Sequence, residues 1–596
     1  MTEPQNMVFR GRSISAGIGI GPASVLPEYQ FEMENVKTIP GEGDKEIERF
    51  YRALEKTRQS THELIEHVSN TLFEQMGELF SVQELVLKDP TFTSRVTRAI
   101  EEENLCAESA VIVALRELNK EFVNRTKGGA LESRSVDFLD VGMRILQQME
   151  TSVSHPQLPQ GGILIARQIA PSLAIRLGEY SIDGLITANT DRSSHTAIVA
   201  QALELPAIGL RDEEFYDIVE PGDEIIVGAN QNQVIVNPSD KKIEIYEKAR
   251  EHFFRFTRDI RKKTQDLTSA ELPITIRGNL GLLSEVSLLK RQGGAGAGLV
   301  RTEFLFMGQA EEIPDEVLQT ETYHQLCHFM EPDPVTIRTF DMGGDKTTYR
   351  ESEEVGGRGV YRTLYNREAM HDQLKALMHV YQEHDNLRVM LPLVGSDAEI
   401  KEVRKMMEEL AEKNGWEIPP LGIMVEVPSV LFQLEEIMDI VDFLSLGTND
   451  LLNYLVGSDR FAAEEADSVD FPDPVLFRFI DRVIRAVGER EIPVGICGEI
   501  AANPIYTPVL MGLGLSELSL APMRMPEVKL VASRCEKEKA EEFAKKALEL
   551  TDRHSLAMWV SEELGPYVQQ ILHENEIPPE SRRFDYYEYK NDETEV

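Results

Sequence analysis

The sequence has few cysteines, little positive charge and no long apolar run. Only four cysteines occur among 596 residues, and no two of them form a Cys-x-x-Cys pair. This pattern argues against a disulfide framework, a zinc ribbon and thioredoxin-type chemistry. The longest apolar runs, such as the one from Ile423 to Val430, are too short to span a membrane, and the segment Met1–Arg12 lacks the apolar core of a secretory signal. We therefore expect a cytoplasmic protein with no membrane insertion.

Positive charge is scarce throughout the chain. Lysine and arginine together number 62 against 102 aspartates and glutamates, which gives a formal net charge of −40. Such a charge argues against nucleic acid and against an anionic membrane as the main partner. The simplest interpretation of this charge is general solubility. A basic protein partner or a high-salt habitat is the second interpretation.

The length of the chain predicts three or more folding units, because 596 residues exceed what one core usually holds. Residues 13–25 are small and favour a strand and turn. Residues 43–150 carry apolar residues at helical spacing with little glycine, which predicts a helical bundle. In residues 160–238 short apolar runs alternate with helical stretches, as in a compact α/β unit. Residues 241–265 form a highly charged helical pattern with little apolar stripe, which indicates a linker helix.

From Leu272 onward, strand-like apolar runs alternate with amphipathic helices. The expected strands are Ile274–Arg277, Gly298–Arg301, Val335–Phe340, Leu387–Leu391, Gly422–Glu426, Phe443–Leu446, Pro493–Cys497 and Glu517–Leu520. Eight β/α units over this length predict a closed (β/α)8 barrel of the TIM type, and thus a multidomain α/β protein. The acidic tail of residues 573–596 is expected to be loosely ordered.

Polar residues stand where the expected barrel strands end, which is where functional residues of such barrels lie. Because parallel strands share one carboxyl end, side chains from five different strands are expected to converge on one mouth. They are Arg301, Asp341, Glu426, the neighbours Asn449 and Asp450, and Cys497.

The carboxylates of this set, together with basic residues in the same part of the chain, suggest a metal ion and a small anion as ligands. Glu426 and Asp450 supply hard carboxylate oxygens, the ligands by which Mg²⁺ is commonly held together with substrate oxygens. Four guanidinium groups and one lysine would suit a phosphate and a carboxylate on the same molecule. These basic residues are Arg301, Arg338, Arg362, Arg460 and Lys346.

One histidine, His195, precedes an apolar helical pattern and is expected at or near a helix N-terminus. That position favours an added phosphoryl anion and keeps the imidazole neutral, hence nucleophilic. A single histidine before a helix is more often a cap or a surface residue, but the barrel residues favour the nucleophile here. His324 and His328, spaced four apart, are interpreted as a helix face rather than a metal pair.

Taken together, these segments resemble enzyme I of the bacterial phosphoenolpyruvate:sugar phosphotransferase system. The stretch Arg192-Ser-Ser-His195-Thr resembles the family's phosphohistidine motif. The resemblance runs in order across about residues 10–570. Its other segments are Ser15–Pro22, Val136–Leu146, Gly298–Met307, Arg338–Lys346, Gly422–Pro428, Ser445–Leu451 and Gly495–Glu499.

The resemblance implies a role for each candidate residue. His195 attacks the phosphorus of phosphoenolpyruvate in line and passes the phosphoryl group to a histidine of the phosphocarrier protein HPr. Glu426 and Asp450 hold Mg²⁺, and Cys497 protonates the enolate to give pyruvate. Phosphoenolpyruvate is bound by Arg301, Arg338, Lys346, Arg362, Asn449 and Arg460. Positioning and charge neutralisation, which such an array supplies, are what phosphoryl transfer mainly requires.

The resemblance also implies a domain plan and a homodimer that pairs through the barrels. A swivelling α/β phosphohistidine domain is expected, interrupted by a helical subdomain that binds HPr. The expected segments are 1–35 and 151–240 for the phosphohistidine domain, 36–150 for the helical subdomain, 241–265 for the linker helix, 266–572 for the phosphoenolpyruvate-binding and dimerisation barrel, and 573–596 for the tail.

Three departures from the family pattern leave alternatives open. The chain has Glu354-Val-Gly-Gly-Arg-Gly-Val-Tyr-Arg362 where the family has Asn-Pro-x-Leu-Gly-Trp-Arg, Thr190-Asp191 where it has Gly-Gly, and Gly308-Gln309 where Asp-Arg is common. A regulatory relative without catalysis is one alternative. Phosphoenolpyruvate synthase and pyruvate phosphate dikinase are a second alternative, because they share the histidine domain and the barrel. They need an ATP-grasp domain before the histidine domain, however, and the first 150 residues do not resemble one.

Overall fold

The computed structural model describes most of the chain, which divides into two compact units, residues 1–255 and 256–596. The described residues are 6–26, 36–37, 42–71, 87, 90–125, 135–149, 161–177, 180–188, 195–264, 267–268, 271–281, 283, 285–305, 314–341, 359–457, 472–488 and 490–573. Of the helices in these residues, none is long and apolar enough to cross a membrane.

The first unit contains an eight-stranded sheet whose strands are ordered β1-β8-β7-β3-β4-β5-β6-β2. Strands β3 to β6 run parallel, and the remaining pairs are antiparallel. The strands are β1 (Met7–Arg10), β2 (Arg12–Ser15), β3 (Ile18–Val25), β4 (Ile163–Ala166), β5 (Gly184–Thr187), β6 (Ala207–Gly209), β7 (Glu224–Gly228) and β8 (Gln233–Val236). Strands β4 and β5 are buried at every position, as continuous apolar runs in parallel sheets usually are.

The sequence predicted one early strand in residues 13–25, but two are present. The chain turns between β2 and β3 at Gly17, whose φ of +132° and contact with Pro206 leave no room for a side chain. The short helices α6 (Pro171–Arg176), α7 (His195–Ala202) and α8 (Glu213–Ile218) follow β4, β5 and β6.

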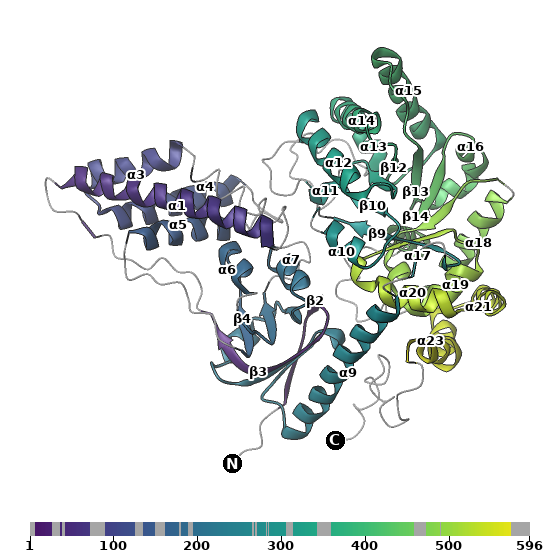
Figure 1. Ribbon diagram of the computed structural model, residues 1–596, viewed down its shortest axis with the longest axis horizontal. Helices are drawn as coiled ribbons and strands as arrows, with labels where there is room; N and C mark the ends of the chain where they lie inside the picture. The colour runs from purple at the N-terminus through teal and green to yellow at the C-terminus, as the bar shows by residue number, and fades with distance from the viewer. Residues whose placement is uncertain are drawn as a thin grey trace. The chain divides into compact units, whose positions relative to one another are not determined.

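A helical bundle is inserted between β3 and β4, where the spacing of apolar residues predicted it (Figure 1). Its helices are α1 (Gly43–Thr71), α3 (Pro90–Glu103), α4 (Ala107–Arg125) and α5 (Ser135–Gln148). Apolar side chains one helical turn apart, such as Phe50 with Leu54 and Phe92 with Val96, are fully buried in its core.

The second unit is a closed barrel of eight parallel strands, as predicted (Figure 1). The strands are β9 (Thr275–Leu280), β10 (Ala297–Arg301), β11 (Val335–Arg338), β12 (Leu387–Leu391), β13 (Leu421–Val425), β14 (Phe443–Leu446), β15 (Val494–Ile496) and β16 (Glu517–Leu520). A cluster of five buried residues fills the interior: Leu299, Met390, Met424, Phe443 and Cys497. The predicted fold class, a barrel with an α/β unit and a helical region, is therefore confirmed.

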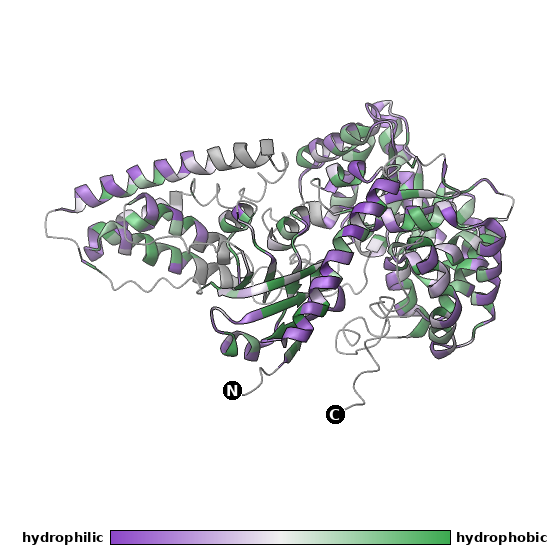
Figure 2. Ribbon diagram, turned by 60° about the horizontal axis from the view of Figure 1, so that its bottom comes forward, coloured by the Kyte–Doolittle hydropathy of each residue, from purple (hydrophilic) through white to green (hydrophobic). Residues whose placement is uncertain are grey.

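Helices surround the barrel and turn their apolar faces toward the strands, while their outer faces are hydrophilic (Figure 2). Helices of this outer layer are α10 (Glu285–Arg291), α12 (Glu316–Met330), α14 (Arg367–Tyr381), α15 (Asp397–Asn414), α18 (Val475–Val487), α20 (Met525–Arg534), α21 (Lys537–Glu549), α22 (Arg553–Trp559) and α23 (Gly565–Leu572). The short helices α16 (Leu434–Met438) and α19 (Thr507–Gly512) are also present. Helices α11 (Thr302–Leu305), α13 (Gly359–Tyr365) and α17 (Thr448–Val456) follow the ends of β10, β11 and β14.

Helix α9 (Asp240–Thr264) covers the segment predicted to be a linker helix. Near its start, Tyr246 is buried with residues of the first unit, and near its end, Ile260 is buried in the core of the barrel unit. Ala249 and Phe256 also pack against these two cores, whereas residues 250–255 between them are at least partly exposed. The helix is thus anchored at both ends, and the expected lack of apolar contacts applies only to its middle. Residues 574–596 of the acidic tail lie outside the described residues.

Candidate active site

The polar residues predicted to meet at the barrel mouth do lie at the carboxyl ends of its strands. Arg301 and Arg338 are the last residues of β10 and β11, Glu426 follows β13, and Cys497 follows β15. Asn449 and Asp450 lie in the first turn of α17, directly beyond β14. Because all eight strands are parallel and the barrel is closed, these side chains share one end of it.

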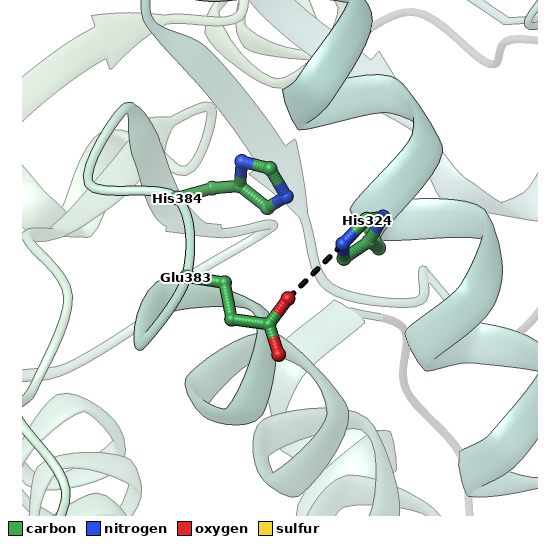
Figure 3. Close-up of side chains that lie close together, drawn as sticks. All are labelled: His324, Glu383 and His384. Atoms are coloured by element: carbon green, nitrogen blue, oxygen red, sulfur yellow. Dashed lines mark hydrogen bonds and ion pairs between the residues drawn. The ribbon is translucent and has the colours of Figure 1, made fainter.

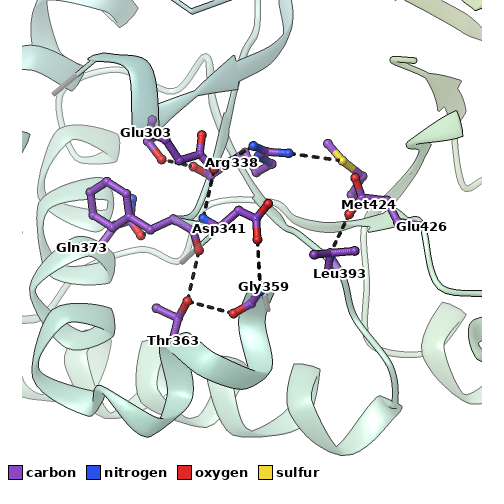
Figure 4. A network of polar contacts seen from close by, with 11 residues as sticks. Glu303, Arg338, Asp341, Gly359, Thr363, Gln373, Leu393, Met424 and Glu426 are labelled. Carbon is purple, nitrogen blue, oxygen red and sulfur yellow. Dashed lines mark hydrogen bonds and ion pairs between the residues drawn. The ribbon is translucent and has the colours of Figure 1, made fainter. Parts of the chain in front are cut away.

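A buried ion pair organises one side of the mouth (Figure 4). Arg338 donates from Nη2 to Oε1 of Glu303 at 2.7 Å, and the same oxygen accepts from the backbone N–H of Asp341 at 3.0 Å. The Asp341 carboxylate in turn accepts from the N–H of Gly359, the first residue of α13, at 3.1 Å. Glu303 therefore fixes both the guanidinium of Arg338 and the backbone of Asp341.

Two polar atoms of this pair are buried without a partner. Within the described residues, Nε of Arg338 and Oε2 of Glu303 make no hydrogen bond. A buried donor or acceptor left unpaired costs about 1–3 kcal/mol, so proteins rarely keep one without a reason. The unpaired guanidinium nitrogen is suited to an anionic ligand entering the mouth.

The charge of Arg338 is maintained by the carboxylates around it. Burial alone would lower its pKa, but the negative charges of Glu303, Glu426 and Asp341 raise the pKa above its ordinary value. The guanidinium is therefore a permanent cation at the floor of the mouth.

Glu426 is buried, and its Oε2 accepts from the backbone N–H of Leu393 at 3.0 Å (Figure 4). The residue opposite it must be glycine, because a Cβ at Gly447 would lie 2.5 Å from Cγ of Glu426. Burial raises the pKa of Glu426 to about 8; Arg338 opposes this, while Asp450 and Asp341 raise it further. The mouth thus has more carboxylates than its buried cation can balance, which fits a bound divalent cation.

Cys497 is buried and closely held. Its N–H donates to the carbonyl of Leu446 at 3.0 Å, and its carbonyl accepts from Nδ2 of Asn279 at 3.0 Å. Burial raises the pKa of Cys497 to about 11, against the lowering effects of a hydrogen bond with Ser445 and of the charges of Arg338 and Arg301. The group is therefore a protonated thiol at neutral pH, and can act as a proton donor.

Asn449 joins two of the strand ends. Its Oδ1 accepts from the backbone N–H of Glu499 at 2.9 Å, which ties the residues after β14 to those after β15. The side chain is exposed at the mouth, in reach of solvent and of ligands.

The side chains of four candidate residues lie outside the described part of the structure. Lys346 and Arg460 lie outside the described residues, as do the departures at 354–358, 190–191 and 308–309. Arg362 lies in α13 and His195 begins α7, so the prediction of a helix N-terminus at His195 is confirmed for the backbone. The side chains of both lie outside the described part of the structure.

Three residues that support the mouth were not predicted. Glu303 lies in a segment that resembles the family, but nothing in the sequence shows its contact with Arg338. Asn279 was missed because the first strand was expected to end at Arg277, whereas β9 continues to Leu280. Gln373 on α14 accepts from the N–H of Phe340 at 3.0 Å, and only its position in an apolar stretch hints at a buried role.

Three segments of the chain match families of enzymes that use phosphoenolpyruvate. Residues 10–130 match "PEP-utilising enzyme, N-terminal", residues 158–232 match "PEP-utilising enzyme, mobile domain", and residues 257–537 match "PEP-utilising enzyme, PEP-binding domain". The last match contains the whole barrel mouth, and the second contains His195. The fold and the matches thus define the class of phosphoenolpyruvate-utilising enzymes.

Full-length relatives narrow this class to one family. A phosphoenolpyruvate-protein phosphotransferase of Haloferax volcanii is 32% identical over 508 residues, which cover 83% of this chain and 88% of the relative. The proteins of the same name from Bacillus subtilis and Priestia megaterium are 29% and 30% identical, over 93% and 86% of this chain and 99% and 91% of theirs. The chain belongs to the family of phosphoenolpyruvate-protein phosphotransferases.

Proposed function

We propose that the chain transfers the phosphoryl group of phosphoenolpyruvate to His195 and then to a histidine of the phosphocarrier HPr, and releases pyruvate. This is the first step of the sugar phosphotransferase system. The observation that carries the proposal is the buried guanidinium of Arg338, whose Nε lacks a partner within the described residues at the mouth of a phosphoenolpyruvate-binding barrel.

The substrate is bound mainly by charge. The buried Arg338 and the partly exposed Arg301 end neighbouring strands and present guanidinium groups to the phosphate and carboxylate, and the exposed Asn449 supplies an amide. Lys346, Arg362 and Arg460 complete the set in this proposal, on the strength of the family motifs alone.

The carboxylates of the mouth fit a magnesium ion. Glu426 and Asp450 offer hard oxygen donors. Burial is the main cause of the raised pKa of Glu426, and the nearby charges of Asp450 and Asp341 raise it further; a divalent cation would stabilise these carboxylates in their charged form. When bound there, Mg²⁺ would neutralise negative charge on the phosphate of the substrate. Gly447 leaves the space that Glu426 needs in order to keep its position.

The chemistry then consists of two bond changes made by side chains of the protein. A nitrogen of His195 forms a bond to phosphorus while the bond between phosphorus and the enol oxygen breaks, and the electron pair remains on the enolate. The thiol of Cys497 gives its proton to the methylene carbon of the enolate, which becomes pyruvate, and solvent restores the thiol. A thiol held protonated by burial is suited to this role.

The two halves of the reaction involve different parts of the chain. His195 lies in the first unit and the mouth lies in the second, so one histidine must serve both the substrate and the carrier. We assign 1–35 and 151–240 to a swivelling phosphohistidine domain, 36–150 to HPr binding, 241–265 to the linker, and 266–572 to the barrel, which pairs in a homodimer.

The four free thiols fit a cytoplasmic location.

Labelled phosphoenolpyruvate tests the proposal directly. With Mg²⁺, the full chain should gain an acid-labile, base-stable phosphoryl group on His195, and the variant His195→Ala should gain none. The exposed His252 provides a matched control, and His252→Ala should be labelled normally. Repeated turnover of phosphoenolpyruvate to pyruvate should require a phosphocarrier and no adenine nucleotide, which separates this reaction from the synthases and from a regulatory protein. A stable label in His195→Ala would refute the assignment.

A further inference from the structure

Three histidines and two glutamates gather at the amino end of the barrel, away from the mouth. His324 and His328 lie on α12, and Glu331 directly follows that helix. Glu383 and His384 follow α14. The two segments lead into β11 and β12, so this histidine cluster lies at the opposite end of these strands from Arg338.

His324, Glu383 and His384 are arranged around one point (Figure 3). Nε2 of His324 lies 3.1 Å from a carboxylate oxygen of Glu383, and one donor atom from each residue lies within 4.8 Å of the others. The rings of His324 and His384 are 4.5 Å apart and nearly perpendicular. In Figure 3 one ring nitrogen of His384 points toward His324, and the other points away.

His384 is the buried member of this group, with 6% of its surface exposed. Its Nδ1 lies 2.5 Å from a carboxylate oxygen of Glu331, and its Nε2 is buried with no hydrogen-bond partner among the described residues. A carboxylate at Nδ1 holds the proton there and leaves a lone pair on Nε2. Metal-binding histidines are commonly oriented by a carboxylate in this way, with the free nitrogen on the ion.

We propose that His324, Glu383 and His384 bind a divalent transition-metal ion, with zinc as the expected occupant and Glu331 as the residue that orients His384. Two imidazoles and a carboxylate suit zinc, whereas magnesium selects oxygen ligands. Ligand atoms around a tetrahedral zinc lie about 3.4 Å apart, so the side chains must close slightly around the ion. His324 and Glu383 can do so because their side chains are 44% and 59% exposed.

The bound ion would join α12 to the segment that enters β12, and would therefore stabilise the amino end of the barrel. It would leave one coordination position for water, because three protein ligands fill only part of a tetrahedron. This site is independent of the proposed phosphoryl transfer, whose residues lie at the other end of the strands.

A second ligand set is possible in principle, since His328, Glu331 and His384 also bring donor atoms within 4.8 Å of one another. That set would have to use Glu331, which is already bonded to Nδ1 of His384, and Nδ1 of His328 lies 3.9 Å from the nearer oxygen of Glu331. It would leave Nε2 of His384 buried and unpaired. The first set satisfies that atom, and the experiment distinguishes the two.

Titration of the full chain with Zn²⁺ tests the site, with calorimetry as the measurement and excess Mg²⁺ present to occupy the carboxylates of the mouth. We expect one ion per chain and a rise in melting temperature on binding. His324→Ala and Glu383→Gln change exposed residues and should each weaken binding at least about tenfold, and Glu331→Gln should weaken it about 10- to 100-fold without removing a ligand. The visible spectrum of bound Co²⁺ should report the two imidazole nitrogens.

The matched control is His328→Ala, one helical turn from His324 on the same helix, with a side chain that is 64% exposed. It should bind Zn²⁺ as tightly as the unaltered chain. Loss of binding in His328→Ala together with normal binding in Glu383→Gln would assign the ion to the second set and overturn the proposal. Absence of stoichiometric binding to the unaltered chain, or equal binding by all four variants, would also overturn it.

Discussion

Two buried arginine–glutamate pairs, one at each end of the barrel, are alike in burial and in length. At the carboxyl end, Arg338 and Glu303 are 2.7 Å apart, with side chains 7% and 13% exposed. At the amino end, Arg277 and Glu517 are 2.5 Å apart, with side chains 11% and 16% exposed. By these measures alone, both pairs would be assigned the same structural role.

The pairs differ in whether they leave a buried polar atom without a hydrogen bond. Arg277 also donates from Nη1 to the carbonyl of Ala295, and none of its polar atoms, nor those of Glu517, is buried without a partner in the described part of the chain. Arg338 and Glu303 each keep one such atom. Arg277 and Glu517 thus leave no buried polar atom unbonded in the described part of the chain, whereas Arg338 and Glu303 each leave one that a ligand could bind. The unpaired Nε2 of His384 marks the proposed metal site by the same argument.

The largest effect on activity should come from changing Arg338, whose Nε is buried without a partner among the described residues. Arg338→Lys keeps the charge but loses the planar fork and its free Nε, so kcat/KM for phosphoenolpyruvate should fall about 100- to 1,000-fold. Arg404→Lys is the matched control, because Arg404 is a half-buried arginine bonded to the carbonyl of Ile440 at the amino end of β14. Normal kinetics in Arg338→Lys would show that the unpaired nitrogen serves no ligand.

The buried thiol at the mouth should affect only the half of the reaction that forms pyruvate. Cys497→Ala should slow phosphorylation by phosphoenolpyruvate about 100-fold or more, because the enolate loses its proton donor. Transfer between phosphorylated enzyme and HPr involves no enolate and should be unchanged, as rapid-quench measurement of each half can show. Cys535→Ala, at another buried thiol, should leave both halves intact. Equal slowing of both halves in Cys497→Ala would contradict the assignment.

A smaller effect is expected from the glutamate that positions Arg338. Glu303→Gln removes the charge that holds the guanidinium and weakens the bond from the N–H of Asp341, so KM for phosphoenolpyruvate should rise about tenfold while kcat changes less. Steady-state kinetics separate the two parameters. A lower melting temperature with unchanged KM would place this pair in the same structural class as Arg277 and Glu517.

The barrel could be predicted from the sequence because most of its strands are short apolar runs, and five of them end in or are followed by a polar residue at the mouth. Glu426 and Cys497 were found in this way. Glu303 could not be, since its partner Arg338 is distant in sequence and meets it only when β10 and β11 pair with Arg301 beside Arg338. Strand β6, with only three residues, was too short to give a pattern.

The histidine cluster shows the same limit. The spacing of His324 and His328 correctly predicted a helix, because one turn of α12 separates them. The third histidine, His384, comes from the end of a different helix, and its burial depends on how α12 and α14 pack. Sequence periodicity describes one element at a time, so a site shared by two elements remains hidden until the fold brings them together.

The smallest effect on activity should come from Arg277 and Glu517, the pair that leaves no buried atom unbonded in the described residues. This pair is therefore the sharpest test of the comparison. Glu517→Gln leaves the charge of Arg277 buried without a counterion, so the free energy of unfolding of the barrel should fall by about 3 kcal/mol, measured by calorimetry. Both kcat and KM should be unchanged at temperatures well below the transition. Replacing both Arg277 and Glu517 by methionine should recover much of the loss, since an apolar pair of similar volume needs no counterion. A rise in KM for Glu517→Gln, like the rise expected for Glu303→Gln, would show that the pair at the amino end also affects substrate binding. The unpaired buried atoms of Arg338 and Glu303 would then no longer distinguish a binding pair from a structural one.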